Sequence, residues 1–122
     1  MLALNRGIGK KVMIGDHVMV EILKVTKDAV LLSIQVPEGV SVKKENGDQI
    51  EERGLIFEVS CKASEQVFID KRVKLEILEI RVRDREIRIG IVAPKEIPIF
   101  RHEVYVRIKQ EQAEHSDVHQ MT

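Results

Sequence analysis

The sequence predicts a mainly β fold that consists of two similar repeats followed by one helix. Three observations predict it. Valine and isoleucine dominate the hydrophobic residues, which make up 43% of the 122-residue chain, and β-branched residues favour sheet. Apolar and polar residues alternate with a period of two in several short runs, which is typical of half-buried strands. The order of these runs also occurs twice along the chain.

The first repeat, residues 1–44, contains five predicted strands. Glycine, proline or aspartate lies in the turns between them, as expected for tight turns. The predicted strands are Met1–Arg6, Val12–Ile14, Val18–Val25, Ala29–Val36 and Val40–Val42. Residues 45–54 that follow are polar, with two glycines and one apolar residue, and this composition predicts a linker.

The second repeat, residues 55–112, contains predicted strands in the same order as the first. The block Val18–Val25 recurs as Val73–Ile80, an offset of 55, and Val30–Ile34 recurs as Ile87–Ile91, an offset of 57. The two extra residues fall in the turn at 81–85, where an insertion costs little. Chance repetition of short Val/Ile patterns explains a single match, but it does not explain an ordered series of them.

The end of the chain changes from strand to helix. The apolar run Ile97–Phe100 predicts a last short strand, and from Arg101 onward the spacing of Val104, Tyr105 and Ile108 is helical. The polar residues 113–122 predict a disordered tail. Residues 1–112 are therefore expected to form one compact domain.

Composition limits the classes of function. Lys plus Arg number 20 and Asp plus Glu number 20, so any attraction to nucleic acid has to be local. The single cysteine, Cys61, excludes an intrachain disulfide and suits a reducing cytoplasm, and no leader or membrane-spanning run is visible. No catalytic motif, metal site or cofactor site is recognisable, so we expect a cytoplasmic protein that is not an enzyme.

Three short motifs are shared with a known family. They are Arg88–Gly90 in a predicted strand, Ala93–Glu96 in the turn after it, and Tyr105 with Arg107 and Ile108 in the helix. In this order they resemble the carbon storage regulator (CsrA/RsmA) family of bacterial RNA-binding translational repressors. Residues 1–44 resemble the same family without a gap. The chain is therefore similar to two family members fused in tandem.

The resemblance implies an intertwined architecture. Single-repeat members of the family are homodimers, because about 45 residues cannot bury enough apolar surface alone. This chain carries both halves, which implies a β-sandwich-like or barrel-like pseudo-dimer in one chain with one C-terminal helix, and a monomer in solution. In the family the first strand of one protomer lies beside the fifth strand of the other, and that pair forms the RNA surface.

Two such surfaces are expected here. The first composite surface consists of Leu4, Arg6, Ile99, Phe100 and Arg101, which match the family's RNA site apart from Ile99 in place of valine and Phe100 in place of histidine. The second composite surface joins the strand predicted at 55–60 with Val42 and Lys44. There we expect Glu58 at the leucine position and Ser60 at the arginine position. A carboxylate repels phosphate, and lysine lacks the planar fork of arginine, so this surface is expected to be degenerate.

Some departures remain in the first composite surface. Gly7 replaces a second arginine, and Pro98 has no N–H to donate and predicts an edge strand. Phe100 either stacks on a base or covers the edge of the core. The resemblance implies capture of a GGA sequence in a hairpin loop of an mRNA leader, or of a small regulatory RNA, with repression of translation. The alternative is a module of the same fold that has lost RNA binding and sequesters a protein partner.

Overall fold

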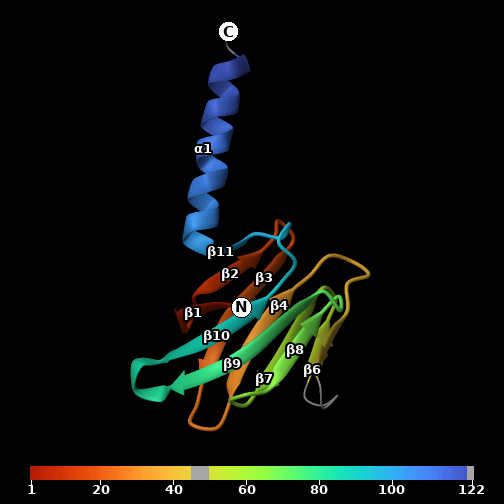
Figure 1. Cartoon of the computed structure of the whole chain (residues 1–122), viewed down its shortest axis with the longest axis vertical. Coiled ribbons are helices and arrows are strands. Elements are labelled where there is room, and N and C mark those ends of the chain that lie inside the picture. Colours follow the sequence, from red (N-terminus) through yellow and green to blue (C-terminus); the bar gives the residue numbers. More distant parts are fainter. Residues whose placement is uncertain (45–49, 121–122) are drawn as a thin grey trace.

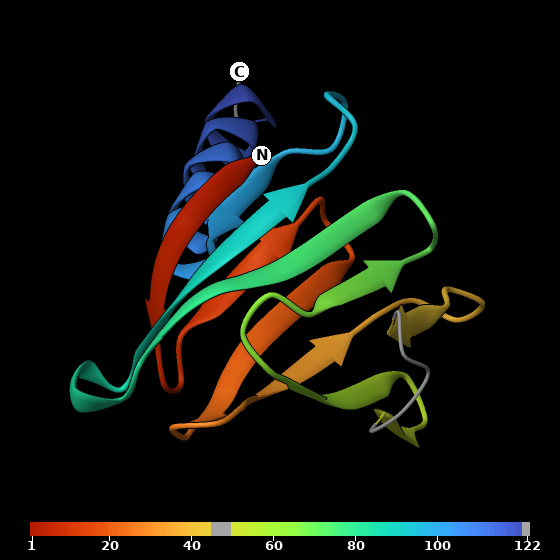
Figure 2. The same cartoon turned by 60° about the horizontal axis from the view of Figure 1, so that its bottom comes forward.

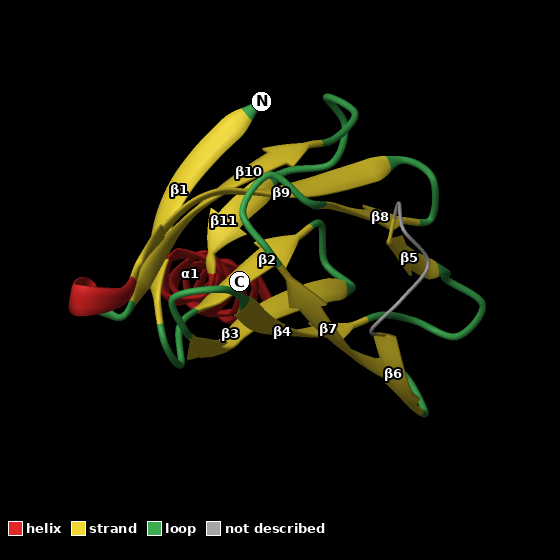
Figure 3. Ribbon diagram, turned by 90° about the horizontal axis from the view of Figure 1, so that it is seen from below, coloured by secondary structure: helices red, strands yellow, loops and turns green. Residues whose placement is uncertain are grey.

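Two antiparallel sheets face each other and enclose one core. The structure is a computed structural model that describes residues 1–44 and 50–120, with side chains up to residue 113. One sheet has the strand order β1-β10-β9-β8-β5 and the other the order β11-β2-β3-β4-β7-β6. The two layers are visible from below in Figure 3. The sequence-predicted β architecture with one C-terminal helix is confirmed.

The strands of the first repeat are β1 (Leu2–Gly7), β2 (Lys11–Ile14), β3 (Val18–Val25), β4 (Val30–Gln35) and β5 (Val42–Lys44). The linker contributes β6 (Ile50–Arg53). The second repeat contributes β7 (Ile56–Cys61), β8 (Gln66–Ile69), β9 (Val73–Arg81), β10 (Glu86–Val92) and β11 (Ile99–Arg101). A 3₁₀ turn, η1 (Val82–Asp84), joins β9 to β10, and the helix α1 (His102–Gln120) ends the described chain.

Each sheet contains strands from both repeats. In the five-stranded sheet, β8, β9 and β10 of the second repeat lie between β1 and β5 of the first. In the other sheet, β2, β3 and β4 of the first repeat lie between β11 and β7 of the second. The colours of Figure 2 show this exchange, with the red β1 beside the cyan β10. The predicted intertwined pseudo-dimer is therefore present within one chain.

The core consists of the inward-facing apolar residues of both sheets. Residues such as Val12, Ile22 and Leu32 of the first repeat are fully buried, as are Ile77 and Ile89 of the second. Their alternation with exposed neighbours matches the period of a strand. Because both repeats contribute to one core, neither can lose its apolar face without exposing the other.

The structure fixes how residues of the two repeats correspond. The turn after β1 has three backbone hydrogen bonds, from the N–H of Gly9 to Ile22, of Lys10 to Gly7, and of Ile22 to Lys10. The turn after β7 repeats all three at positions exactly 55 residues later, with Ser64 in the place of Gly9. The added residues of the second repeat lie at η1, as predicted, where Arg85 adopts a left-handed conformation with φ of 50°. The offset is thus 55 before η1 and 57 after it.

Two parts of the chain differ from the sequence prediction. Residues 50–53 of the predicted linker form β6, which pairs antiparallel with β7 (Figure 3). Gly54, with φ of +64°, gives the tight turn between them, and the polar composition of the segment hid this hairpin. Residues 45–49 lie outside the described part.

The structure also has helix at most of the positions where the sequence predicts a disordered tail. The helix α1 continues to Gln120 and projects away from the sheets (Figure 1). Glutamine, glutamate and alanine around residues 110–113 are good helix formers, so local propensity extends the helix without an apolar face. No helix in the described part of the chain is long and apolar enough to cross a membrane.

Candidate nucleic-acid interface

Arg6 lies at the inner side of the end of β1. In the register, Leu4 is opposite Ile89 and Arg6 is opposite Ile87, and both isoleucines are fully buried. Leu4 packs against the core, whereas the Arg6 side chain extends to the rim of the sandwich with only 6% of its surface exposed. A buried guanidinium needs a charged or polar partner.

The partner is Glu103, in the first turn of α1. The Nη2 of Arg6 donates to Oε1 of Glu103 at 2.9 Å and to Oε2 at 3.2 Å. Burial raises the pKa of the Glu103 carboxyl, but its own backbone N–H and Arg6 lower it by more, so this pKa lies below its usual value. Within the described residues, the Nε of Arg6 is buried without a hydrogen-bond partner. Arg6 therefore retains a donor that its neighbours do not satisfy.

An aspartate in the turn between β2 and β3 holds α1 in place. The hydroxyl of Tyr105 donates to Oδ1 of Asp16 at 3.1 Å, and Nζ of Lys109 lies 3.1 Å from the same oxygen. Hydrogen bonds from Lys109 and Tyr105 lower the pKa of Asp16. Tyr105 and Lys109 are four residues apart and so share one face of the helix. This contact fixes the start of α1, and with it the position of Glu103.

A basic hollow lies beside the Arg6 side chain. It has a volume of about 220 Å³ and is lined by Arg6, Lys10, Lys11 and His102, with Glu103 as its carboxylate. Arg101 immediately precedes His102 and is exposed at the end of β11. The cations of this region are Arg6 of β1, Lys10 of the turn after it, Lys11 of β2 and Arg101 of β11. Their convergence gives a local positive surface on a chain with no net charge.

The other predicted residues of the first composite surface lie on β11. This strand is at the edge of its sheet, as Pro98 predicted, and pairs only with β2 in the described chain. Ile99 packs against the core. Phe100 is half-buried and opposite Met13, which is itself buried. Its ring therefore covers an edge of the hydrophobic structure, and part of it remains accessible.

The register corrects the predicted composition of the second composite surface. On β7, Val59 is opposite Leu32 and Cys61 is opposite Val30. Because Leu32 and Val30 correspond to Ile89 and Ile87, Val59 occupies the place of Leu4 and Cys61 the place of Arg6. Glu58 and Ser60 point to the other side of the strand. The prediction used an offset of 54, one residue short, which moves every side chain to the opposite face.

The charged groups of the second composite surface bind each other. Lys44 is buried, and its Nζ lies 2.6 Å from Oε2 of Glu65 and donates to the carbonyl of Ser60 at 2.9 Å. Glu65 corresponds to Lys10, so the repeat carries a carboxylate where the first surface has a cation. The hydrogen bond from Lys44 lowers the pKa of Glu65. Burial raises the pKa of the Cys61 thiol to about 11, which keeps it neutral.

The outer face beside this surface is acidic. Glu51 of β6 lies directly opposite Glu58 of β7. These two carboxylates, with Ser60, Leu31 and Ile50, line a hollow of about 250 Å³. Val42, the remaining predicted residue, is buried in the core. On the second composite surface Lys44 is therefore not free to bind a phosphate, whereas Lys43, at the place of Phe100, and Lys62, at the place of Gly7, are exposed.

Both repeats of the chain match a known protein family. A model of the "CsrA: Global regulator protein family" matches residues 1–51 and again residues 59–110. The chain belongs to this family. The two matched regions coincide with the two intertwined repeats, so the predicted tandem arrangement is confirmed.

Individual family members resemble this chain over about one repeat. The translational regulator CsrA of Treponema pallidum (strain Nichols) is 37% identical over 59 residues, which are 48% of this chain and 78% of that protein. The translational regulator CsrA of Lachnoclostridium phytofermentans is 36% identical over 59 residues, or 48% and 79%. That of Alkaliphilus oremlandii is 40% identical over 53 residues, or 43% and 69%. No solved structure matches the chain significantly.

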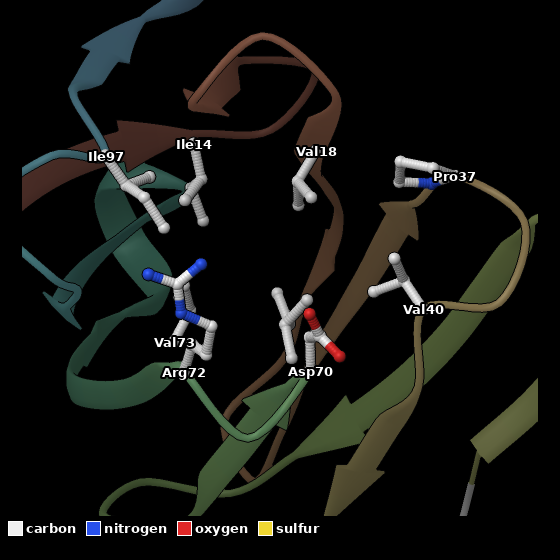
Figure 4. A pocket seen from close by; sticks show the side chains of 9 residues that line it. Ile14, Val18, Pro37, Val40, Asp70, Arg72, Val73 and Ile97 are labelled. Atoms are coloured by element: carbon white, nitrogen blue, oxygen red, sulfur yellow. The ribbon is translucent and has the colours of Figure 1, made fainter.

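An apolar cavity of about 100 Å³ lies elsewhere between the two sheets (Figure 4). Corresponding residues of the CsrA-like repeats line it in pairs, namely Ile14 with Ile69, Val18 with Val73, and Val40 with Ile97. It therefore lies between equivalent parts of the two repeats. Arg72 at the rim of this cavity forms an ion pair with Glu96, so its positive charge is balanced there.

Sequence reasoning missed three residues that decide the charge of the two surfaces. Lys10 and Glu65 lie in turns and were not compared, because the repeats were aligned by their apolar blocks. The offset of 55 found for those blocks, applied to the turns, would have paired them. Glu103 was read as part of a helix, and only the fold brings it to Arg6, 97 positions away in sequence.

Proposed function

We propose that this chain is an RNA-binding translational regulator that binds one GGA-containing hairpin loop at its first composite surface. The observation that carries the proposal is the contrast in charge between the two surfaces. Cations line the hollow beside Arg6, whereas Lys44 is tied to Glu65 on the other side. The relatives described above are named translational regulators, which supports the same role here.

The chemistry of the first composite surface suits single-stranded RNA. Lys10 and Lys11 line the hollow and Arg101 is exposed at the end of β11, so these three cations can hold phosphates. In the described chain β1 pairs only with β10, so the backbone groups of its outer edge are free to read base edges. With aromatic residues at 3%, a platform of stacked bases is a poor alternative. Occupation of an mRNA leader near its ribosome site would block initiation.

A calorimetric titration with a short GGA hairpin tests this proposal. We expect a plateau at one RNA per chain, and no binding of the same hairpin with GGA replaced by CCU. The logarithm of the binding constant should fall with the logarithm of salt with a slope near −0.7 per phosphate contact. Two equivalent RNAs per chain would contradict the single site, and no binding at all would reject the RNA function.

The chain should act as a monomer, because each repeat already finds its exchange partner in the other. Light scattering is expected to give a mass near 14.0 kDa with or without the short hairpin, apart from the mass of the RNA. A stable species of about twice the chain mass would indicate exchange of repeats between chains.

The second candidate function is a protein-binding module without RNA affinity. The engagement of Arg6 by Glu103 favours it, because a carboxylate already occupies the place that a phosphate would take. Salt dependence separates the two candidates. A protein-binding module gives no gel shift with a GGA hairpin at any salt concentration, whereas an RNA regulator shifts it most strongly at low salt.

A further inference from the structure

The two equivalent strands β1 and β7 differ in what lies along their outer edges. β7 pairs with β6 over four residue pairs, from Ile50 opposite Val59 to Arg53 opposite Ile56. β1 lies at the edge of its sheet, with β10 as its neighbour on one side. An open edge presents unpaired N–H and C=O groups, and a paired edge does not. The backbone of β7 is thus closed where that of β1 is open.

Several contacts hold β6 in this position. Gly54 and Leu55 form a two-residue turn, in which Gly54 has φ of +64°. The N–H of Val36 donates to the carbonyl of Leu55 at 3.0 Å, which ties the turn to the end of β4. Ile50, at the other end of β6, packs against the core. The hairpin is therefore anchored at both of its ends.

β6 also adds negative charge beside β7. Its Glu51 is opposite Glu58, and like charges directly opposite each other are unfavourable in a sheet. Arg53 relieves part of this repulsion, because its Nη2 lies 2.8 Å from Oε1 of Glu51. An approaching phosphate would meet these carboxylates and a backbone edge whose hydrogen bonds are already used.

We infer that β6 is a built-in blocking strand that closes the second composite surface to RNA. This inference rests on the proposed RNA function and goes beyond it, because it assigns the loss of the second site to backbone pairing as well as to side chains. It follows that replacement of Cys61 and Lys44 by arginine does not restore RNA binding while β6 stays paired with β7.

Transfer of the hairpin to the first composite surface tests the inference. Ile56 corresponds to Met1, so a second copy of residues 50–55 inserted between a new start methionine and Met1 should form the same hairpin on β1. We expect the affinity for a GGA hairpin to fall at least tenfold. The matched control carries the same insertion with Gly54→Pro in the added copy, because proline cannot adopt φ of +64°. This control has the same charge and should bind as the unmodified chain does.

Hydrogen exchange on the free proteins provides the second readout. In the unmodified chain, the outward amides of β7 should exchange more slowly than those of β1, and equal rates would overturn the inference whether or not RNA binds. In the grafted chain the β1 amides should become protected. Unchanged RNA affinity in that chain, or β1 amides that stay unprotected, also overturns it. Failure of the unmodified chain to bind RNA instead rejects the proposed function.

Discussion

The two composite surfaces are built on equivalent strands and turns, but they differ in their charged side chains and in the pairing of the outer strand edge. Their strands and turns match in register and hydrogen bonding, but several charged or polar positions differ between the first surface and the second, among them Arg6 and Cys61, Lys10 and Glu65, and Arg101 and Lys44. On the first surface cations line a hollow, and on the second Lys44 is held in an internal ion pair with Glu65. These side chains, together with the pairing of β6 with β7, distinguish the second surface from the proposed RNA site.

The comparison shows which residues a duplicated fold can change. Inward-facing positions remain apolar in both repeats, for example Ile14 and Ile69, or Ile22 and Ile77, because the repeats share a single core. Removing one such side chain would destabilise the whole chain by about 2 to 5 kcal/mol. Turn positions such as Lys10 and Glu65 are not part of this core and carry no such constraint. The second surface can therefore carry Cys61 where the first has Arg6, while its strands still contribute to the shared core.

The largest effect is expected when the first surface receives the carboxylate of the second. In Lys10→Glu, the new carboxylate should pair with Arg101, as Glu65 pairs with Lys44. Two phosphate contacts are then lost. At about 1.4 kcal/mol each, they amount to roughly a hundredfold weaker binding of a GGA hairpin. Fluorescence anisotropy at fixed salt measures this change.

The control for this variant makes the same change of charge elsewhere. Lys27 is exposed in the turn between β3 and β4 and lies outside both the basic hollow and β11. Lys27→Glu should weaken binding no more than about twofold, since an exposed charge beyond a Debye length of about 10 Å is screened. Equal losses in both variants would show that only net charge matters.

A smaller loss is expected from Arg101→Ala, which removes one exposed cation from the first surface. One arginine on a phosphate or base edge contributes about 1 to 3 kcal/mol, so the hairpin should bind at least about tenfold more weakly. The salt slope should also become shallower by about 0.7, which a titration series measures. Arg53→Ala is the matched control, because Arg53 is an exposed arginine at the edge of β6. A similar loss in both would contradict the assignment of the site.

Glu103→Gln should change RNA binding in the opposite direction. The Glu103 carboxylate competes with phosphate for Arg6, and the amide competes less well, so we expect the affinity to rise about threefold at neutral pH. The Glu103 side chain is half-exposed, so screening keeps this effect modest. A fall in affinity would mean that Glu103 serves to hold Arg6 in place for RNA.

The same pair predicts a pH dependence. Because its own backbone N–H and Arg6 together outweigh burial and lower the pKa of Glu103, its ionised form stabilises the fold above the usual carboxyl pKa near 4.5, and this stabilisation is lost as the pH falls through the lowered value. Thermal melts of the unmodified chain should therefore show a contribution below pH 4.5 that is missing in Glu103→Gln. Identical pH profiles would show that the pair contributes nothing to stability.

Much of this fold was predictable from sequence for a physical reason. Period-two alternation and the repeated blocks are set by burial, which acts on every residue of a strand, so one wrong residue does not hide the pattern. The edge position of β11 followed from Pro98 alone. The family resemblance then supplied the exchange of strands, which short-range patterns do not contain.

The site was harder to predict because it depends on single residues and on exact register. The shift of one position on β7 put Glu58 and Ser60 in the place of Val59 and Cys61, and only the pairing with β4 corrects it. β6 was not predicted from the sequence, because its polar side chains face solvent and its stability comes from backbone hydrogen bonds and one turn. Such features leave little trace in composition.

The smallest effect is expected from Lys44→Met, which tests whether the second surface takes part in RNA binding. The lysine is buried, and its Nζ binds Glu65 and the carbonyl of Ser60, so it is not placed to reach a phosphate. Methionine keeps most of the apolar stem, and Glu65 can turn to solvent, so we expect the fold to remain and the hairpin affinity to change less than about twofold. Lys11→Met makes the same exchange in the basic hollow and should weaken binding several-fold. If Lys44→Met proves as damaging as Lys11→Met in the same anisotropy titration, the RNA reaches both surfaces, and the contrast between an open and a closed site is wrong.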